Sequence, residues 1–110
     1  STKEILGVLG AEHPVKLHIL RLRALIARDR GKLAQARGEF EAALAFAEST
    51  PDADQVATAE ARVELAALLV DNDRERAGNL VDQALPILSE AVLPIAPARI
   101  EAERLHAELR

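Results

Sequence analysis

The stretch GKLAQARGEFEAAL, from Gly31 to Leu44, decides the fold, because a turn glycine is followed by small and large apolar residues at helical spacing. The same pattern returns in the second half of the chain at a constant offset (77 − 36 = 41), where Ala36, Phe40, Ala43 and Leu44 are matched by Ala77, Val81, Ala84 and Leu85. Asn72 stands opposite Gly31, and both residue types enter the left-handed backbone region at low cost. A repeat of this length with helical periodicity predicts stacked helical hairpins.

The composition is that of one soluble folded domain. Of the 110 residues 49% are hydrophobic and 29% are charged, a balance that favours a packed core over disorder. The chain has no cysteine, which excludes disulfides and thiolate metal sites. A formal charge of −4 and the absence of Trp and Tyr argue against a nucleic-acid partner. No apolar run approaches the roughly 18 residues of a membrane span, and the amino terminus lacks a signal-peptide pattern, so we expect no membrane partner and a cytoplasmic protein.

Gly, Pro, Asn and Asp residues interrupt the apolar periodicity and predict helices over about 14–30, 32–49, 54–70, 74–92 and 98–110. We therefore predict a single all-α domain over 1–110, with hairpins at about 14–50 and 54–92 and partial repeats at 1–10 and 97–110. Because the apolar helical pattern runs into both ends and no initiating Met is present, we interpret the chain as a fragment of a longer protein.

The first helix of each hairpin carries two apolar stripes, which predicts that it packs on two sides. In the segment 14–30 one stripe consists of Val15, Ile19, Leu22 and Ile26, and the other of Leu17, Leu20, Ala24 and Ala27. The terminal repeats would then lack part of their natural cover. We expect this to cause self-association or fraying through Ile5, Leu6 and Leu9 at one end and Leu105 and Leu109 at the other.

A small residue in mid-helix, a large apolar residue four positions later and an Ala-Leu pair beyond it make the repeat resemble the tetratricopeptide repeat. The period, roughly 41 to 42 residues, and the sequence LGAEHP at 9–14 are similar to the longer variety in kinesin light chains and in bacterial proteins that append such repeats to kinases or regulators. The resemblance implies an α-solenoid, a right-handed superhelix of antiparallel hairpins. Arg23 and Glu64 depart from the family pattern, in which Leu is usual; either the turn is a residue shorter, or the first helices are rotated.

The same resemblance implies a non-catalytic scaffold that binds another protein or peptide in a concave groove lined by the first helices. It places seven residues on that side: His18, Arg21, Leu25, Arg28, Arg62, Ala66 and Leu69. This surface would be basic, and the planar fork of arginine suits carboxylates, so the implied partner is an acidic segment. The alternative is that these arginines pair with Glu on adjacent turns.

Chemical motifs for catalysis are weak. His13, His18 and His106 lack metal-ligand spacing, and no nucleophile, paired carboxylate or glycine-rich phosphate loop stands in a plausible arrangement. We therefore expect no enzyme, metal or cofactor. The alternative to the scaffold is a closed helical bundle that serves as a dimerisation or regulatory segment of a larger signalling or regulatory protein. The helix boundaries recur at a fixed period, which favours an open array of stacked hairpins, because the packing of a closed bundle does not require such a repeat.

Overall fold

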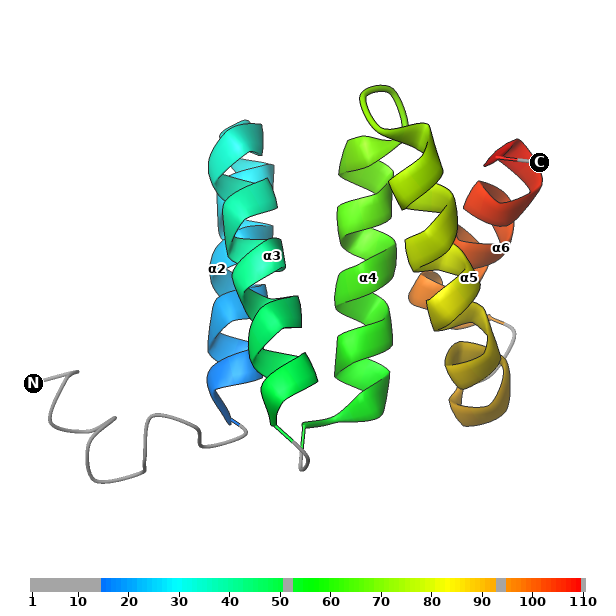
Figure 1. Cartoon of the computed structure of the whole chain (residues 1–110), viewed down its shortest axis with the longest axis horizontal. Helices are drawn as coiled ribbons and strands as arrows, with labels where there is room; N and C mark the ends of the chain where they lie inside the picture. The colour runs from blue at the N-terminus through cyan, green and yellow to red at the C-terminus, as the bar shows by residue number, and fades with distance from the viewer. Residues whose placement is uncertain (1–14, 51–52, 93–94, 110) are drawn as a thin grey trace, which may run out of the picture.

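The computed structural model describes residues 15–50, 53–92 and 95–109 and contains helices only in these ranges, which confirms the all-α class (Figure 1). The five helices are α2 (Val15–Asp29), α3 (Leu33–Ser49), α4 (Gln55–Leu69), α5 (Arg74–Ala91) and α6 (Pro97–Leu109). The partial repeat predicted at 1–10 lies outside the described residues. No helix in the described part is long and apolar enough to cross a membrane.

The helix ends follow from local chemistry. Gly31 has φ of 77°, and its N–H and that of Lys32 donate to the carbonyls of Arg28 (3.0 Å) and Ala27 (2.9 Å), which closes α2 as a Schellman motif. The carboxylate of Asp54 caps α4 by accepting from the N–H groups of the second and third residues after it, at 2.9 and 3.0 Å.

The second turn differs from the first. No described residue other than Gly31 has positive φ, so the expected left-handed conformation of Asn72 is wrong. Asp73 caps α5 instead, with its carboxylate accepting from the N–H of Arg76 at 3.2 Å. Pro86 lies within α5, which continues past it to Ala91, as predicted.

Burial shows how the two hairpins correspond. The fully buried or nearly buried residues Leu17, Ala24 and Ala27 of α2 are matched by Ala59, Ala66 and Leu69 of α4. These pairs share an offset of 42 (66 − 24 = 42), whereas the second helices keep an offset of 41. The separation between the corresponding buried positions Leu69 and Ala77 is therefore one residue shorter than that between Ala27 and Ala36, and Arg23 corresponds to Leu65.

The helices pair along the chain, and all contacts join helices that are consecutive or two apart in the sequence. Helix α2 packs on α3 and α4 packs on α5; α4 also contacts α2, α3 and α6, and α6 contacts α5. Among the described residues, no Cα of α2 or α3 comes within 8 Å of α6. In Figure 1 the hairpin of α2 and α3, then that of α4 and α5, then α6 follow one another along the longest axis, and the extents are 46 × 31 × 22 Å.

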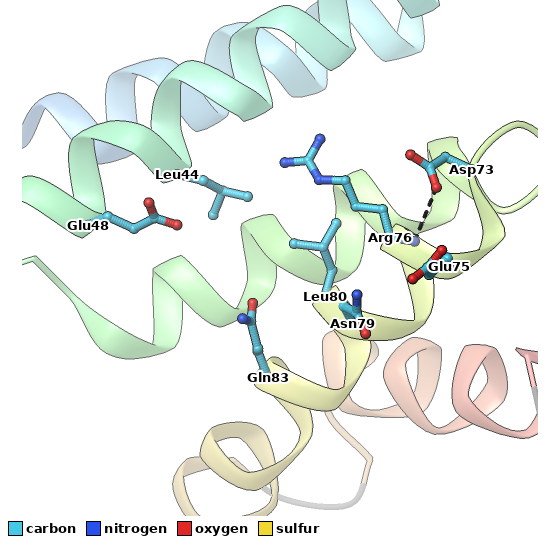
Figure 2. Close-up of a pocket in the computed structure, with 8 residues that line it drawn as sticks. All are labelled: Leu44, Glu48, Asp73, Glu75, Arg76, Asn79, Leu80 and Gln83. Carbon is cyan, nitrogen blue, oxygen red and sulfur yellow. Dashed lines mark hydrogen bonds between the residues drawn. The ribbon is translucent and has the colours of Figure 1, made fainter.

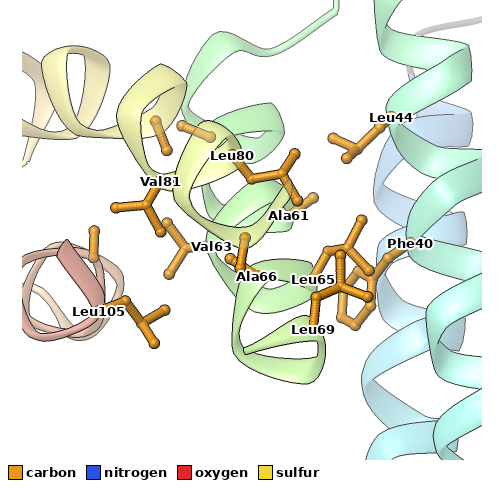
Figure 3. Packing of buried hydrophobic residues seen from close by; sticks show 14 of the residues in the cluster. Phe40, Leu44, Ala61, Val63, Leu65, Ala66, Leu69, Leu80, Val81 and Leu105 are labelled. Atoms are coloured by element: carbon orange, nitrogen blue, oxygen red, sulfur yellow. The ribbon is translucent and has the colours of Figure 1, made fainter. Parts of the chain in front are cut away.

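The larger core cluster is aliphatic around one aromatic ring. Phe40 is fully buried, and Figure 3 shows its ring beside Leu65 and Leu69 of α4, which confirms that it packs between the two hairpins. Ala36 and Ala43 are also fully buried, and their small side chains allow the facing helix to approach closely. A second, smaller cluster is built from Leu17, Ala43, Phe46, Ala53 and Ala57.

Two-sided packing of a first helix is confirmed for α4, which buries residues of both its stripes, such as Val63 and Leu65. In α2, Val15, Ile19, Leu22 and Ile26 are exposed, so no helix of the described residues covers this stripe. Leu105, expected to lack cover at the C-terminal end, is buried, and Leu109 is partly buried against the same core. The reason is that this face of α6 meets the preceding helices α4 and α5.

Candidate functional site

The seven predicted groove residues do not share one surface. Ala66 and Leu69 are fully buried in the core, so their side chains offer nothing to a partner. The physical reason is that the first helices correspond at an offset of 42 and not 41, so these positions match the buried Ala24 and Ala27 of α2. Leu25 is partly buried and packs against the core, and Arg62 is half-buried.

Arg21 and Arg28 do come together, in a pocket where α2, α4 and α6 meet. The pocket has a volume of about 270 Å³. Its other lining residues are Glu60, Val63, Glu64, Pro97, Ala98 and Glu101. Two arginines and three glutamates therefore share it, so the expectation of a basic surface is wrong for this pocket.

Arg21 is held by the carboxylates of α4. Its Nε donates to Glu64 Oε1 at 2.7 Å and its Nη2 to Glu64 Oε2 at 2.8 Å, a bidentate pair, and Glu60 lies 3.6 Å away. The hydrogen bonds to Glu64 raise the pKa of Arg21 further, against the opposing effect of burial. Arg21 is therefore paired with glutamates, but they lie on α4 and not on adjacent turns of its own helix.

The remaining predicted cations are more exposed. Arg28 Nη2 lies 3.3 Å from Asp29, the next residue, in a contact of a kind that contributes little to stability. His18 lies 3.9 Å from Asp54 and is half exposed. On α6, the guanidinium of Arg104 donates to Glu101 and lowers the pKa of that carboxyl. In the pocket, Arg28 is thus the cation left most available to a ligand.

A second depression, of about 460 Å³, lies between α3 and α5 (Figure 2). Leu44 and Leu80, both nearly buried, provide its apolar part. The other lining residues are polar or charged: Glu48, Asp73, Glu75, Arg76, Asn79 and Gln83. The sequence gives no sign of this surface, because the surface depends on two second helices that lie on either side of a gap. The spacing of residues within one helix does not indicate such an arrangement.

A bidentate ion pair crosses from α5 to α3 beside this depression. The guanidinium of Arg76 donates to both carboxylate oxygens of Glu41. These hydrogen bonds lower the pKa of Glu41 and raise that of Arg76, in each case against a smaller opposing effect of burial. The cation nearest this depression is therefore already paired with a carboxylate.

Potential metal ligands do not cluster in the part of the chain that the structure describes. Residues 15–50, 53–92 and 95–109 contain no group of three His, Cys, Asp or Glu placed to hold a metal ion. His106 lies 3.4 Å from a single carboxylate, Asp82, and His18 likewise has one such neighbour. His13 lies outside the described residues.

The pocket lined by α2, α4 and α6 therefore contains two of the predicted groove residues, Arg21 and Arg28, together with residues of the other two helices. Comparison of the chain with protein-family models, with curated proteins and with solved structures finds no match.

Proposed function

We propose that the chain is a non-catalytic interaction module of tetratricopeptide type that binds a segment of another protein along the face formed by α2, α4 and α6. One observation carries the proposal: a single open pocket is lined by residues of all three first helices. The contacts of α4 with both α2 and α6 support a continuous face, as in an α-solenoid.

The contact pattern weighs against the closed bundle. In a closed bundle the first and last helices would bury their apolar stripes against each other. Within the described residues α6 lies beyond 8 Å, Cα to Cα, from α2 and α3. An open array leaves a face of first helices available, and this is the arrangement that the proposed function needs.

The chemistry of the pocket favours a partner segment with both signs of charge in place of the uniformly acidic partner that the sequence suggests. Glu64 already neutralises Arg21, which leaves Arg28 to receive a carboxylate of the partner. Glu60, about a third exposed, is placed to receive a basic side chain. Ala98, which is partly buried, supplies apolar surface between these charges.

A charge reversal tests the proposal. Peptides would first be selected from a random library for binding to the unaltered chain, and their affinity would then be measured by calorimetry. Arg28→Glu is expected to weaken the selected peptides at least about tenfold, which corresponds to ~1.4 kcal/mol. Arg37→Glu makes the same change of charge on an exposed position of α3, away from the pocket, and is the matched control.

The control should bind within about twofold of the unaltered chain, and the circular dichroism melts of both variants should coincide with it. Undiminished binding by Arg28→Glu, or equal losses in both variants, would contradict binding at this pocket. A library that yields no specific binder would contradict the proposed function itself.

A further inference from the structure

A small basic pocket lies at the end of the first hairpin where α2 passes into α3 (Figure 1). Its volume is about 130 Å³, and it shares no lining residue with the pocket of α2, α4 and α6. The residues that line it are Arg23, Ile26, Ala27, Arg30, Lys32 and Gln35. Three of these side chains are cations and none is a carboxylate, so the pocket has the chemistry of an anion site.

Two of the three cations have no counter-ion. Arg30 and Lys32 are exposed, and no carboxylate of the described residues lies within ion-pair distance of either. Arg23 pairs with Glu39 at 3.1 Å, but its side chain is 61% exposed, and an exposed pair of this kind is weak. The pocket therefore presents two unpaired positive charges beside a third that is only partly neutralised.

The backbone beside the pocket adds to this positive potential. Lys32 stands immediately before α3, where its side chain offers no acceptor to the N–H groups of the first turn, and that turn contains no acidic residue. Gln35 of the same turn lines the pocket. The residue in the equivalent place before α5 is Asp73, whose carboxylate accepts from the N–H of Arg76. The hairpin fold therefore does not need a cation at this position.

We propose that this pocket binds a doubly charged phosphoryl group. A phosphomonoester carries about two negative charges near neutral pH, which match the two unpaired cations. The guanidinium of Arg30 can donate two parallel hydrogen bonds to phosphoryl oxygens, and the ammonium of Lys32 supplies a compact charge beside it. A single carboxylate would leave one of these two cations without a partner.

The apolar part of the lining favours a phosphorylated side chain over free phosphate as the source of this group. Ile26 is 44% exposed and lines the pocket beside the cations. Its side chain can contact the carbon atoms next to an ester oxygen, which free phosphate lacks. A phosphoserine in a protein segment is therefore the expected source. The inference does not depend on binding at the pocket of α2, α4 and α6, which other residues line.

Chemical-shift titration of an isotopically labelled chain tests the proposal. The probes are inorganic phosphate, acetate, and a short peptide without charged side chains in its phosphoserine and serine forms, all at constant ionic strength near neutral pH. Phosphate and the phosphopeptide should cause saturable changes that are largest at the backbone N–H groups of Gly31, Lys32 and Gln35. The phosphopeptide should bind more tightly than phosphate, and acetate and the serine peptide should cause no saturable change.

A matched pair of variants locates the site. Arg30→Gln is expected to weaken the phosphopeptide at least about tenfold, which corresponds to ~1.4 kcal/mol. Arg37→Gln removes the same charge from an exposed position of α3 that does not line the pocket, and it should bind within about twofold of the unaltered chain. Adding Lys32→Gln to Arg30→Gln should abolish saturable binding. The circular dichroism melts of these variants should coincide with that of the unaltered chain.

Three outcomes would overturn the proposal. The first is the absence of saturable changes with both phosphate and the phosphopeptide. The second is an equal loss of binding in Arg30→Gln and Arg37→Gln, or changes spread over exposed cations throughout the chain, since either result indicates non-specific attraction. The third is acetate binding as tightly as phosphate, which excludes selection for a doubly charged group. Phosphate binding as tightly as the phosphopeptide would overturn the phosphorylated segment as the source.

Discussion

Replacing Phe40 with alanine is expected to lower the free energy of unfolding by about 3 to 5 kcal/mol. Phe40 is fully buried between the hairpins, where its ring lies beside Leu65 and Leu69 of α4 (Figure 3). Removal of the ring leaves a cavity that Ala36 and its other small neighbours cannot fill. For a domain with a total stability of about 5 to 15 kcal/mol, this loss is a large part of the whole.

Urea unfolding followed by circular dichroism measures this effect, since the chain has no Trp or Tyr for fluorescence. The midpoint should fall while the slope stays constant. Phe40→Leu retains most of the buried volume and is expected to cost only about 1 kcal/mol. If the urea midpoint of Phe40→Ala is indistinguishable from that of the unaltered chain, the assignment of Phe40 to the core is wrong.

Leu69→Ala is expected to cost about 2 to 5 kcal/mol, the range for a buried leucine. The sequence placed Leu69 in a binding groove, where its truncation would weaken binding and leave stability unchanged. The structure places it at 0% exposure in the core cluster. The thermal melt of this variant therefore distinguishes a core position of Leu69, which predicts a lower melting temperature, from a groove position, which predicts an unchanged one.

Leu33→Ala is the matched control, because Leu33 is 55% exposed at the start of α3 and loses the same atoms. Its stability should stay within about 0.5 kcal/mol of the unaltered chain. If Leu69→Ala melts as Leu33→Ala does, the assignment of Leu69 to the core is wrong.

The second helices were predictable because their pattern and their turn signals agree. The stripe around Phe40 predicts a buried face, and Gly31 marks the turn by the one conformation that favours glycine. Ala77 and Val81 then repeat the small and large positions, and both are fully buried. Local residue choice alone decides these features.

The bounds of the first helices were predicted correctly to within about one residue. The positions of α2 and α4 were matched at an offset of 41, however, whereas their buried residues correspond at an offset of 42. The sequence does not show that the connection from Leu69 to Ala77 is one residue shorter than that from Ala27 to Ala36. A shift of one residue turns a helical position by about 100°, which is enough to move Ala66 and Leu69 from a groove to the core.

The charges of the candidate site depend on pairings across the fold. Arg21 and Glu64 lie 43 residues apart, and Arg76 and Glu41 lie 35 apart, so neither pair has a signal within one helix. Without knowledge of these pairs, the predicted groove residues Arg21, Arg28 and Arg62 indicate a basic face. The exposed stripe of α2 was likewise hidden, because two apolar stripes predict two packed sides whether or not a neighbour covers them.

Chemical-shift mapping of an isotopically labelled chain with a library-selected peptide tests most directly whether a protein segment binds the face of α2, α4 and α6. The largest changes are expected at Arg28, Val63 and Glu101, which line the pocket from three different helices. Residues along the depression between α3 and α5, such as Glu48 and Gln83, should shift little. Changes confined to that depression, or spread over the chain without a maximum at the pocket, would contradict binding on the face of the first helices.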